Sequence, residues 1–264
     1  MLAKTRGLVL KEIKYRDTSA ICSLYTRDFG RVSVILKGGR NPKNRLSGLF
    51  ITGNLLEVVL YRTGNRSLSP VREARIVISP MASEPDLDRF STLYRIIDIV
   101  RNTTGNEEKS PRLFDALSRT VETLCKPRQN TDAVLAWFFM RLVSSMGFEP
   151  SIEQCVLTGK PVMATLEAEP ETRLYFLDDP GGVMLQNPAG QAPPGGRPIP
   201  VGAYLLMRAL RKIDAEAIDS LEAGRNDCQR VCDILQHYCS FHSEYSIPGK
   251  NRKVINQILS LPQR

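Results

Sequence analysis

The chain has 264 residues and a hydrophobic content of 42%, enough apolar side chains for more than one folding unit. It contains no run of about 18 consecutive apolar residues, and its start lacks the apolar block of about 7–15 residues that marks a signal peptide. We therefore expect no membrane span and a cytoplasmic location. The net charge of +8 is uneven, because residues 1–80 carry fifteen Lys and Arg against five Asp and Glu, whereas residues 81–264 carry 21 against 23. A basic module joined to a nearly neutral one favours a face that binds polyanions.

The first eighty residues predict five short strands. Apolar and polar residues alternate, or β-branched and aromatic residues cluster, over residues 5–14, 20–26, 31–36, 55–61 and 67–78. Glycine-containing breaks at residues 28–30, 38–39 and 63–65 suit the turns of hairpins. This pattern predicts a small barrel of the oligonucleotide-binding (OB) type, although a fragment of a β-sandwich would have the same number of strands.

After Ser79 and Pro80 the apolar period changes from two towards 3.6, following a helix-capping signal at residues 83–86. Helices are predicted over residues 87–100, 112–125, 131–146, 202–213, 227–242 and 250–259. Between them, residues 150–200 lose the helical period and hold two β-like runs (173–177 and 183–186) and a stretch rich in Pro and Gly. The predicted fold is therefore α+β, with a five-stranded OB-type barrel (1–80) and a helical body (81–264) that contains a small irregular insertion (150–200).

The strongest local signal is the run of residues 37–45 (KGGRNPKNR) between two predicted strands. No acidic residue lies between Asp28 and Glu57. Glycines let a backbone approach a phosphate closely, and Lys and Arg attract phosphates without regard to base sequence. The candidate DNA-binding residues are Arg31, Lys37, Gly38, Arg40, Lys43, Arg45, Arg62 and Arg66. A solvated loop whose charges aid solubility is the alternative. Because aromatic residues are few in this part of the chain, we expect contacts mainly with the nucleic-acid backbone.

Candidate metal and catalytic sites are weak. Cys228, Cys232, Cys239 and His242 share one face of a predicted helix, but two helical turns separate Cys232 from Cys239 by about 10.5 Å. Since a Zn–S bond is about 2.3 Å, one zinc ion cannot take ligands from both ends of that stripe, and these cysteines are predicted to be reduced core thiols. The same interpretation covers Cys22 and Cys125. No Walker sequence, nucleophile elbow or zinc-protease helix is present in the sequence, so we expect no enzymatic activity.

Four segments, in order, resemble the RecO family of bacterial recombination mediators. They are residues 5–11 (TRGLVLK), residues 25–31 (YTRDFGR) with 37–40 (KGGR), residues 138–150 (FFMRLVSSMGFEP), and residues 155–159 (CVLTG). Many members of that family hold a zinc ion in the insertion through four cysteines. This chain keeps Cys155 but has Thr158 where the next thiol would stand, and residues 181–188 lack the second pair. We therefore predict a zinc-finger-like insertion without metal or cofactor, packed by its own apolar residues.

The resemblance also implies a function. RecO-like proteins bind single- and double-stranded DNA through the barrel and anneal complementary strands. With RecR, and with RecF in one pathway branch, they help to load RecA onto DNA coated by single-strand-binding protein. This implies a protein of DNA repair that is associated with the nucleoid. RecO-like proteins also bind the acidic, apolar C-terminal tail of the coating protein through the helical body. The candidate residues for binding that tail here are Arg141, Arg208, Arg211 and Lys212.

Three alternatives remain open from the sequence. The four candidate tail-binding residues are equally compatible with ordinary solvated helix charges. The barrel also suits an RNA-binding factor in translation or ribosome assembly, which would prefer structured RNA to single-stranded DNA. A metal-dependent enzyme hidden in the insertion would bind metal stoichiometrically, and a single cysteine ligand argues against it.

Overall fold

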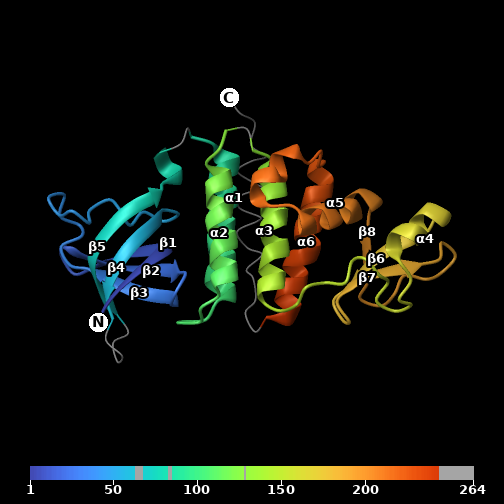
Figure 1. The fold of residues 1–264 in the computed structure, drawn as a ribbon, viewed down its shortest axis with the longest axis horizontal. Helices are drawn as coiled ribbons and strands as arrows, with labels where there is room; N and C mark the ends of the chain where they lie inside the picture. The colour runs from blue at the N-terminus through green and yellow to red at the C-terminus, as the bar shows by residue number, and fades with distance from the viewer. Residues whose placement is uncertain (63–67, 83–84, 128, 244–264) are drawn as a thin grey trace. The chain divides into compact units, whose positions relative to one another are not determined.

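The computed structural model describes residues 1–62, 68–82, 85–127 and 129–243 (Figure 1). The chain forms two compact units, the first containing Met1–Pro127 and the second Arg128–Tyr245. The first unit thus continues beyond the barrel through two helices, and the proposed domain boundary at residue 80 stays a prediction. In the part of the chain that is described, no helix is long and apolar enough to cross a lipid bilayer.

The first unit begins with the predicted five-stranded barrel. Its strands are β1 (Leu2–Tyr15), β2 (Ser19–Thr26), β3 (Gly30–Leu36), β4 (Leu55–Tyr61) and β5 (Ser69–Ile78). They close in the order β1-β2-β3-β5-β4. Neighbouring strands are antiparallel except for β3 and β5, which run parallel and pair at Val34–Ser69 and Ile35–Pro70. The α+β class with an N-terminal barrel is therefore confirmed.

Alternation along the strands fills the barrel. On β3, Val32, Val34 and Leu36 are buried, whereas the residues between them point outwards. On β1, Val9 belongs to the barrel core, while its neighbours Leu8 and Leu10 are buried on the other side of the strand. Because both faces of β1 are covered, the apolar run at residues 8–10 does not alternate.

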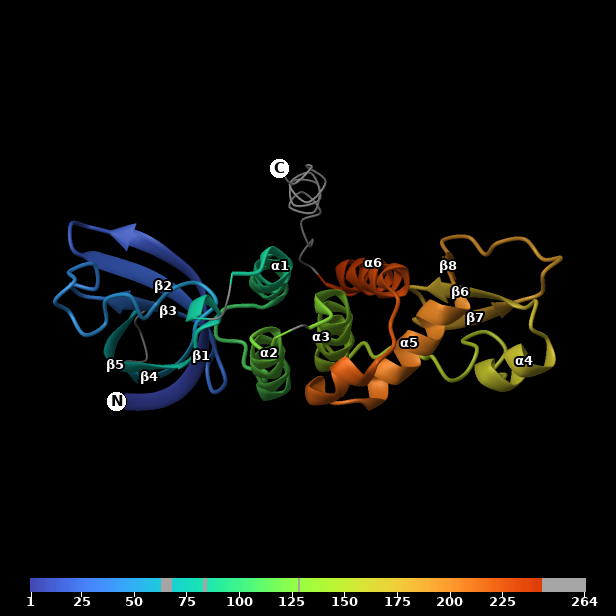
Figure 2. The ribbon, with the colours of Figure 1, turned by 90° about the horizontal axis from the view of Figure 1, so that it is seen from above.

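Two helices follow a short 3-10 turn, η1 (Pro80–Ala82), and lie side by side beside the barrel in Figures 1 and 2. α1 (Leu87–Thr103) begins at the N-cap Asp86, whose carboxylate accepts a hydrogen bond from the backbone N–H of Arg89. α2 (Pro111–Leu124) begins at Ser110, and its proline occupies the first turn, where no N–H is needed. Both helices were predicted. Ser83, the other end of the predicted capping signal, lies outside the described residues.

The connection between α1 and α2 packs on the turn between β2 and β3. The backbone N–H of Glu107 donates to the carbonyl of Arg31 at 3.0 Å, and Asn106 forms a parallel bridge with Arg31. Gly30 has φ +64, and a Cβ at this position would lie 2.3 Å from the carbonyl oxygen of Glu108. The close approach therefore requires glycine at this position.

The second unit is built around α3 (Thr131–Ser145), α5 (Val201–Lys212) and α6 (Arg225–His242), with a 3-10 segment η2 (Ala215–Ser220) between the last two. Every residue of α3 from Ala133 to Met140 is buried, as expected for a central helix. The indole Nε1 of Trp137 donates to the carbonyl of Ile213 at 3.0 Å. Cys228, Cys232 and Cys239 are buried on α6, which confirms them as core thiols. The predicted helix at 250–259 lies outside the described residues.

The insertion is more regular than predicted. β6 (Arg173–Leu177) and β7 (Gly182–Gln186) match the two β-like runs, and β8 (Arg197–Ile199) joins them in a sheet of order β7-β6-β8. A seven-residue helix, α4 (Val162–Ala168), precedes the sheet. The body is therefore not entirely helical. The sequence signal missed β8 because three residues beside prolines are too few for a period, and α4 because its N-cap, Pro161, makes no side-chain capping bond.

Candidate nucleic-acid interface

The loop after β3, here called the basic loop (residues 37–49), is a chain of hydrogen-bonded turns. The backbone N–H groups of Asn41, Asn44 and Ser47 donate to the carbonyls three residues earlier, at 2.9–3.0 Å. The side chain of Asn44 also donates to the carbonyl of Lys37 at 3.0 Å. Leu46 and Leu49 pack on the barrel core. The basic loop is therefore held in a defined conformation by the barrel.

The cations of the basic loop have two different roles. Lys37, Lys43 and Arg45 are exposed, and their side chains have no hydrogen-bond or ion-pair partner within the described ranges. Arg40 instead anchors the loop, because its Nη1 donates to the carbonyls of Arg16 and Asp17 at 3.3 and 3.0 Å. Its backbone N–H donates to Thr18 at 3.0 Å. Three predicted cations thus face solvent, while the fourth fixes their position.

The anchor brings a second cationic segment to the same end of the barrel. Lys14 pairs with Ala20 and Ala20 pairs with Leu36, so the end of β1 lies level with the start of the basic loop. We call the resulting surface the basic end. It contains Lys14, Arg16, Lys37, Arg40, Lys43 and Arg45, with the carboxylate of Asp17. An excess of cations of this kind attracts a phosphate backbone independently of base sequence.

Lys14 and Arg16 were absent from the sequence-based candidates. They precede the basic loop by more than twenty residues, and only the hairpin register places them beside it. One sequence pattern could have placed them there. The strands predicted at 5–14 and 20–26 form a hairpin, and the turn of that hairpin must lie level with the end of the next antiparallel strand.

Arg31 and Arg62 lie at the opposite end of the barrel from the basic loop. The guanidinium of Arg31 donates to Asn106 Oδ1 at 2.9 Å and to the carbonyl of Arg101 at 2.7 Å. Arg62 pairs with Glu107 at 2.8 Å and stacks 4.4 Å from the centre of the Phe29 ring. The structure therefore separates these two arginines from the other candidates and gives them contacts that join the barrel to the connection between α1 and α2. Arg66 lies outside the described residues.

In the second unit, most of the candidates for binding a protein tail make internal contacts. Arg208 pairs with Glu153 at 3.0 Å and Arg211 with Glu149 at 2.7 Å. Arg141 donates to the carbonyls of Arg211 and Ile213. These bonds tie the end of α5 to α3 and to residues 149–153, whereas Lys212 is exposed.

Cys155 occupies a tight turn opposite β7. Its thiol accepts a hydrogen bond from the backbone N–H of Leu185 at 3.3 Å. Burial acts to raise the pKa of Cys155, but hydrogen bonds from Leu185, Leu157 and Thr158 outweigh it and lower the pKa below its ordinary value. Among the described residues, no group of three or more His, Cys, Asp or Glu is placed to hold a metal ion. One thiol does not fit a structural zinc site that takes four ligands, and the absence of a cofactor stays a prediction.

Comparison with known proteins identifies the family to which this chain belongs. Residues 1–80 match the family model of the Recombination protein O N terminal, and residues 84–250 match that of the Recombination protein O C terminal. A DNA repair protein RecO of Chlorobium phaeobacteroides (strain BS1) is 56% identical over 259 residues, covering 98% of this chain and 99% of the relative. One from Prosthecochloris aestuarii is 46% identical, with 98% of each chain covered, and one from Chloroherpeton thalassium is 28% identical, covering 98% of this chain and all of the relative. The chain belongs to the RecO family.

Proposed function

We propose that the chain binds single- and double-stranded DNA at the basic end of the barrel and anneals complementary strands. The observation that carries this proposal is the accumulation of six cations and one carboxylate at one end of a closed barrel. A barrel of this order commonly holds oligonucleotides through its connecting loops. Membership of a family named for recombination and DNA repair supports DNA rather than another polyanion.

The proposed mechanism is electrostatic. Lys37, Lys43 and Arg45 neutralise phosphates of a bound strand, and this lowers the repulsion that a second strand meets on approach. Because the basic end offers cations and few exposed rings, the bases stay free to pair with their complement. The family is one of recombination mediators rather than enzymes, and annealing requires no bond to be made or broken.

The proposal includes protein partners in the cytoplasm, at the nucleoid. The chain acts with RecR, and with RecF in one pathway branch, to load RecA onto DNA coated by single-strand-binding protein. For the acidic, apolar tail of the coating protein we retain α5, where Val201 and Leu205 are 46% and 43% exposed and Lys212 lies two turns beyond Leu205. Exposed apolar residues followed along the same helix by a cation suit such a tail. The end of α5 is held in place by the contacts of Arg141, Arg208 and Arg211.

A strand-annealing assay tests the proposal. Complementary oligonucleotides are mixed with the chain, with and without single-strand-binding protein, and without nucleotide. We expect annealing on bare and on coated DNA, and on coated DNA we expect it to require the tail of the coating protein. K37A/K43A/R45A should slow annealing, while the control K109A/R112A/K126A removes the same charge from exposed residues outside the basic end. DNA binding without annealing, or a marked preference for structured RNA, would overturn the proposal.

A further inference from the structure

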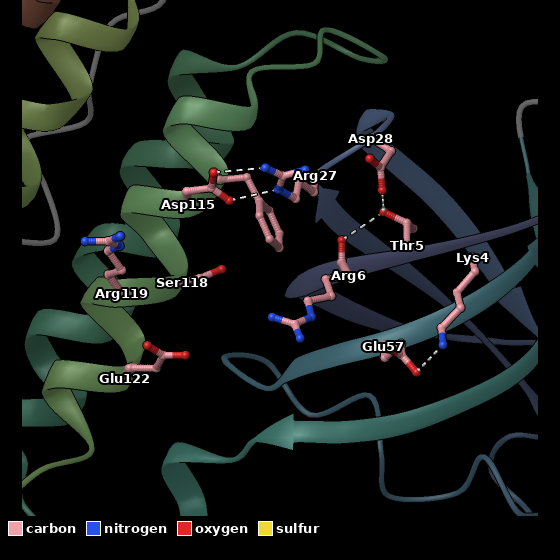
Figure 3. Close-up of a pocket in the computed structure, with 11 residues that line it drawn as sticks. Lys4, Thr5, Arg6, Arg27, Asp28, Glu57, Asp115, Ser118, Arg119 and Glu122 are labelled. Atoms are coloured by element: carbon pink, nitrogen blue, oxygen red, sulfur yellow. Dashed lines mark hydrogen bonds and ion pairs between the residues drawn. The ribbon is translucent and has the colours of Figure 1, made fainter.

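A pocket of about 510 Å³ opens in the first unit between the barrel and α2 (Figure 3). The start of β1 and the end of β2 form its barrel wall, together with Glu57 of β4. α2 supplies the opposite wall through Ser118, Glu122 and their neighbours. The pocket lies near the start of β1, whereas the basic end lies where β1 finishes. It is therefore distinct from the proposed DNA-binding surface.

Most of the charged groups around the pocket are already paired. Arg27 makes a two-pronged contact with Asp115, at 2.9 and 3.2 Å. Glu57 accepts Arg75 at 2.7 Å and Lys4 at 3.0 Å, and hydrogen bonds from these two cations hold the pKa of Glu57 down to about 2. The carboxylate of Glu57 is therefore already paired with two cations of the chain.

Three groups remain without a partner among the described residues. Arg6 stands opposite Glu57 in the strand register, but Glu57 is taken by its other neighbours. Glu122 is exposed on α2, and the buried Oγ of Ser118 has no hydrogen-bond partner. Figure 3 shows the Arg6 guanidinium directed from β1 towards α2, and the side chains of Ser118 and Glu122 directed from α2 towards the barrel. The pocket thus offers an unpaired cation on one wall and an unpaired carboxylate with a hydroxyl on the other.

These features select the chemistry of a guest. The pocket is lined by four carboxylates (Asp28, Glu57, Asp115 and Glu122) and by four cations (Lys4, Arg6, Arg27 and Arg119), so it lacks the excess of positive charge that attracts a phosphate backbone. A small-molecule site is typically enclosed and mainly apolar, whereas this pocket is open and lined mostly by charged side chains. Complementary charges of both signs are instead typical of the docking of one protein on another.

We propose that this pocket receives a segment of a protein partner that presents a carboxylate to Arg6 and a cation to Glu122. The Oγ of Ser118 and the side chain of Phe114 line the same pocket but are buried, so the contact is made by the exposed side chains of Arg6 and Glu122. Arg6 is suited to this role because a guanidinium holds a carboxylate through two parallel hydrogen bonds. The partner is therefore a protein whose surface carries both an acidic and a basic side chain at the contact. The proposed DNA-binding surface lies at the opposite end of the barrel.

The test rests on the function proposed above, because it uses RecR of the same organism as the probe. Binding of the full chain to RecR is measured by calorimetry for the unaltered chain, R6E and E122K. Both variants should bind RecR about tenfold to a hundredfold more weakly, since each loses a charge-assisted contact. R6E lowers the net charge by two and E122K raises it by two, so a general charge effect would change the two affinities in opposite directions.

R72E and E73K are the matched controls. Arg72 and Glu73 form a neighbouring ion pair on β5 outside the pocket, at 3.4 Å, and their charge changes equal those of R6E and E122K. These controls should leave RecR binding unchanged, and R6E should bind DNA as R72E does. Circular dichroism and thermal unfolding verify that each variant is folded, and R6Q replaces R6E if the charge reversal unfolds the chain.

Each unfavourable result has a separate meaning. If the unaltered chain binds RecR and both pocket variants bind it equally well, the pocket proposal is wrong and the proposed function stands. Opposite changes in R6E and E122K, or a weaker DNA affinity of R6E than of R72E, also overturn the pocket proposal. If the unaltered chain does not bind RecR, the partner part of the proposed function fails, and the pocket proposal fails with it.

Discussion

Removing the three exposed cations of the basic loop should weaken DNA binding in a manner that depends on salt. Lys37, Lys43 and Arg45 have no partner within the described residues, whereas Arg40 holds the loop in place. K37A/K43A/R45A therefore removes phosphate contacts and keeps the anchor. Each contact with a single strand contributes about 0.7 to the slope of log K against log salt, so the slope should become shallower by about 2.

This change in slope determines how much the affinity difference between the unaltered chain and the variant depends on salt. Between 50 and 200 mM salt, the ratio of the unaltered chain's affinity to that of the variant should shrink by about 15-fold, because salt rises fourfold and the slopes differ by about 2. The assay is fluorescence anisotropy on a labelled oligonucleotide of mixed sequence across a salt series, with K109A/R112A/K126A as the charge-matched control. An unchanged slope in the loop variant, or an equal change in the control, would refute the assignment of phosphate contacts to the basic loop.

Three further predictions concern stability and reactivity. Because the pKa of Glu57 is lowered from 4.5 to about 2, its ion pairs stabilise the fold above pH 4.5 and are lost as the pH falls towards 2; E57Q should show a smaller acid dependence of unfolding over that interval. Cys125, which the sequence wrongly predicted to be a core thiol, is the one partly exposed thiol among six. Native protein at neutral pH should therefore show one fast thiol towards a disulfide reagent and six after denaturation; several fast thiols would contradict the buried positions. R141A should reduce the free energy of unfolding by about 1–3 kcal/mol, since two carbonyls lose a charged donor, and an unchanged denaturant midpoint would contradict this.

The sequence was sufficient where a period extends over several turns or strand pairs. The five strands and the helices at α1, α2, α3, α5 and α6 follow from alternation and from helical spacing. The short elements α4 and β8 span seven and three residues, too few for a period to appear. Closure of the barrel through the parallel pair β3 and β5 depends on contacts between strands far apart in the chain, which no local pattern encodes.

The sequence predicted one group of candidate cations, whereas the structure places them at two ends of the barrel, and the reason is geometric. Arg31 lies near the start of β3 and Lys37 directly follows its end, and six residues of extended chain separate their backbones by about 20 Å. Cations that are close in sequence thus lie at opposite ends of the barrel. Conversely, Lys14 and Lys37 are distant in sequence and lie at the same end through the register of β1, β2 and β3.

The narrow pairing of β3 with β5 has a consequence for how the barrel can be isolated. The pairs Val34–Ser69 and Ile35–Pro70 join the second half of β3 to its parallel neighbour, and the first half is covered at Arg31 by backbone from residues 106–107. An uncovered strand edge offers open backbone hydrogen-bonding groups to other molecules and promotes aggregation. A fragment cut after residue 80 would present such an edge, whereas one that continues to Pro127 keeps it covered. The smallest well-behaved fragment that carries the basic end therefore includes the helical pair, whose connection completes the barrel wall.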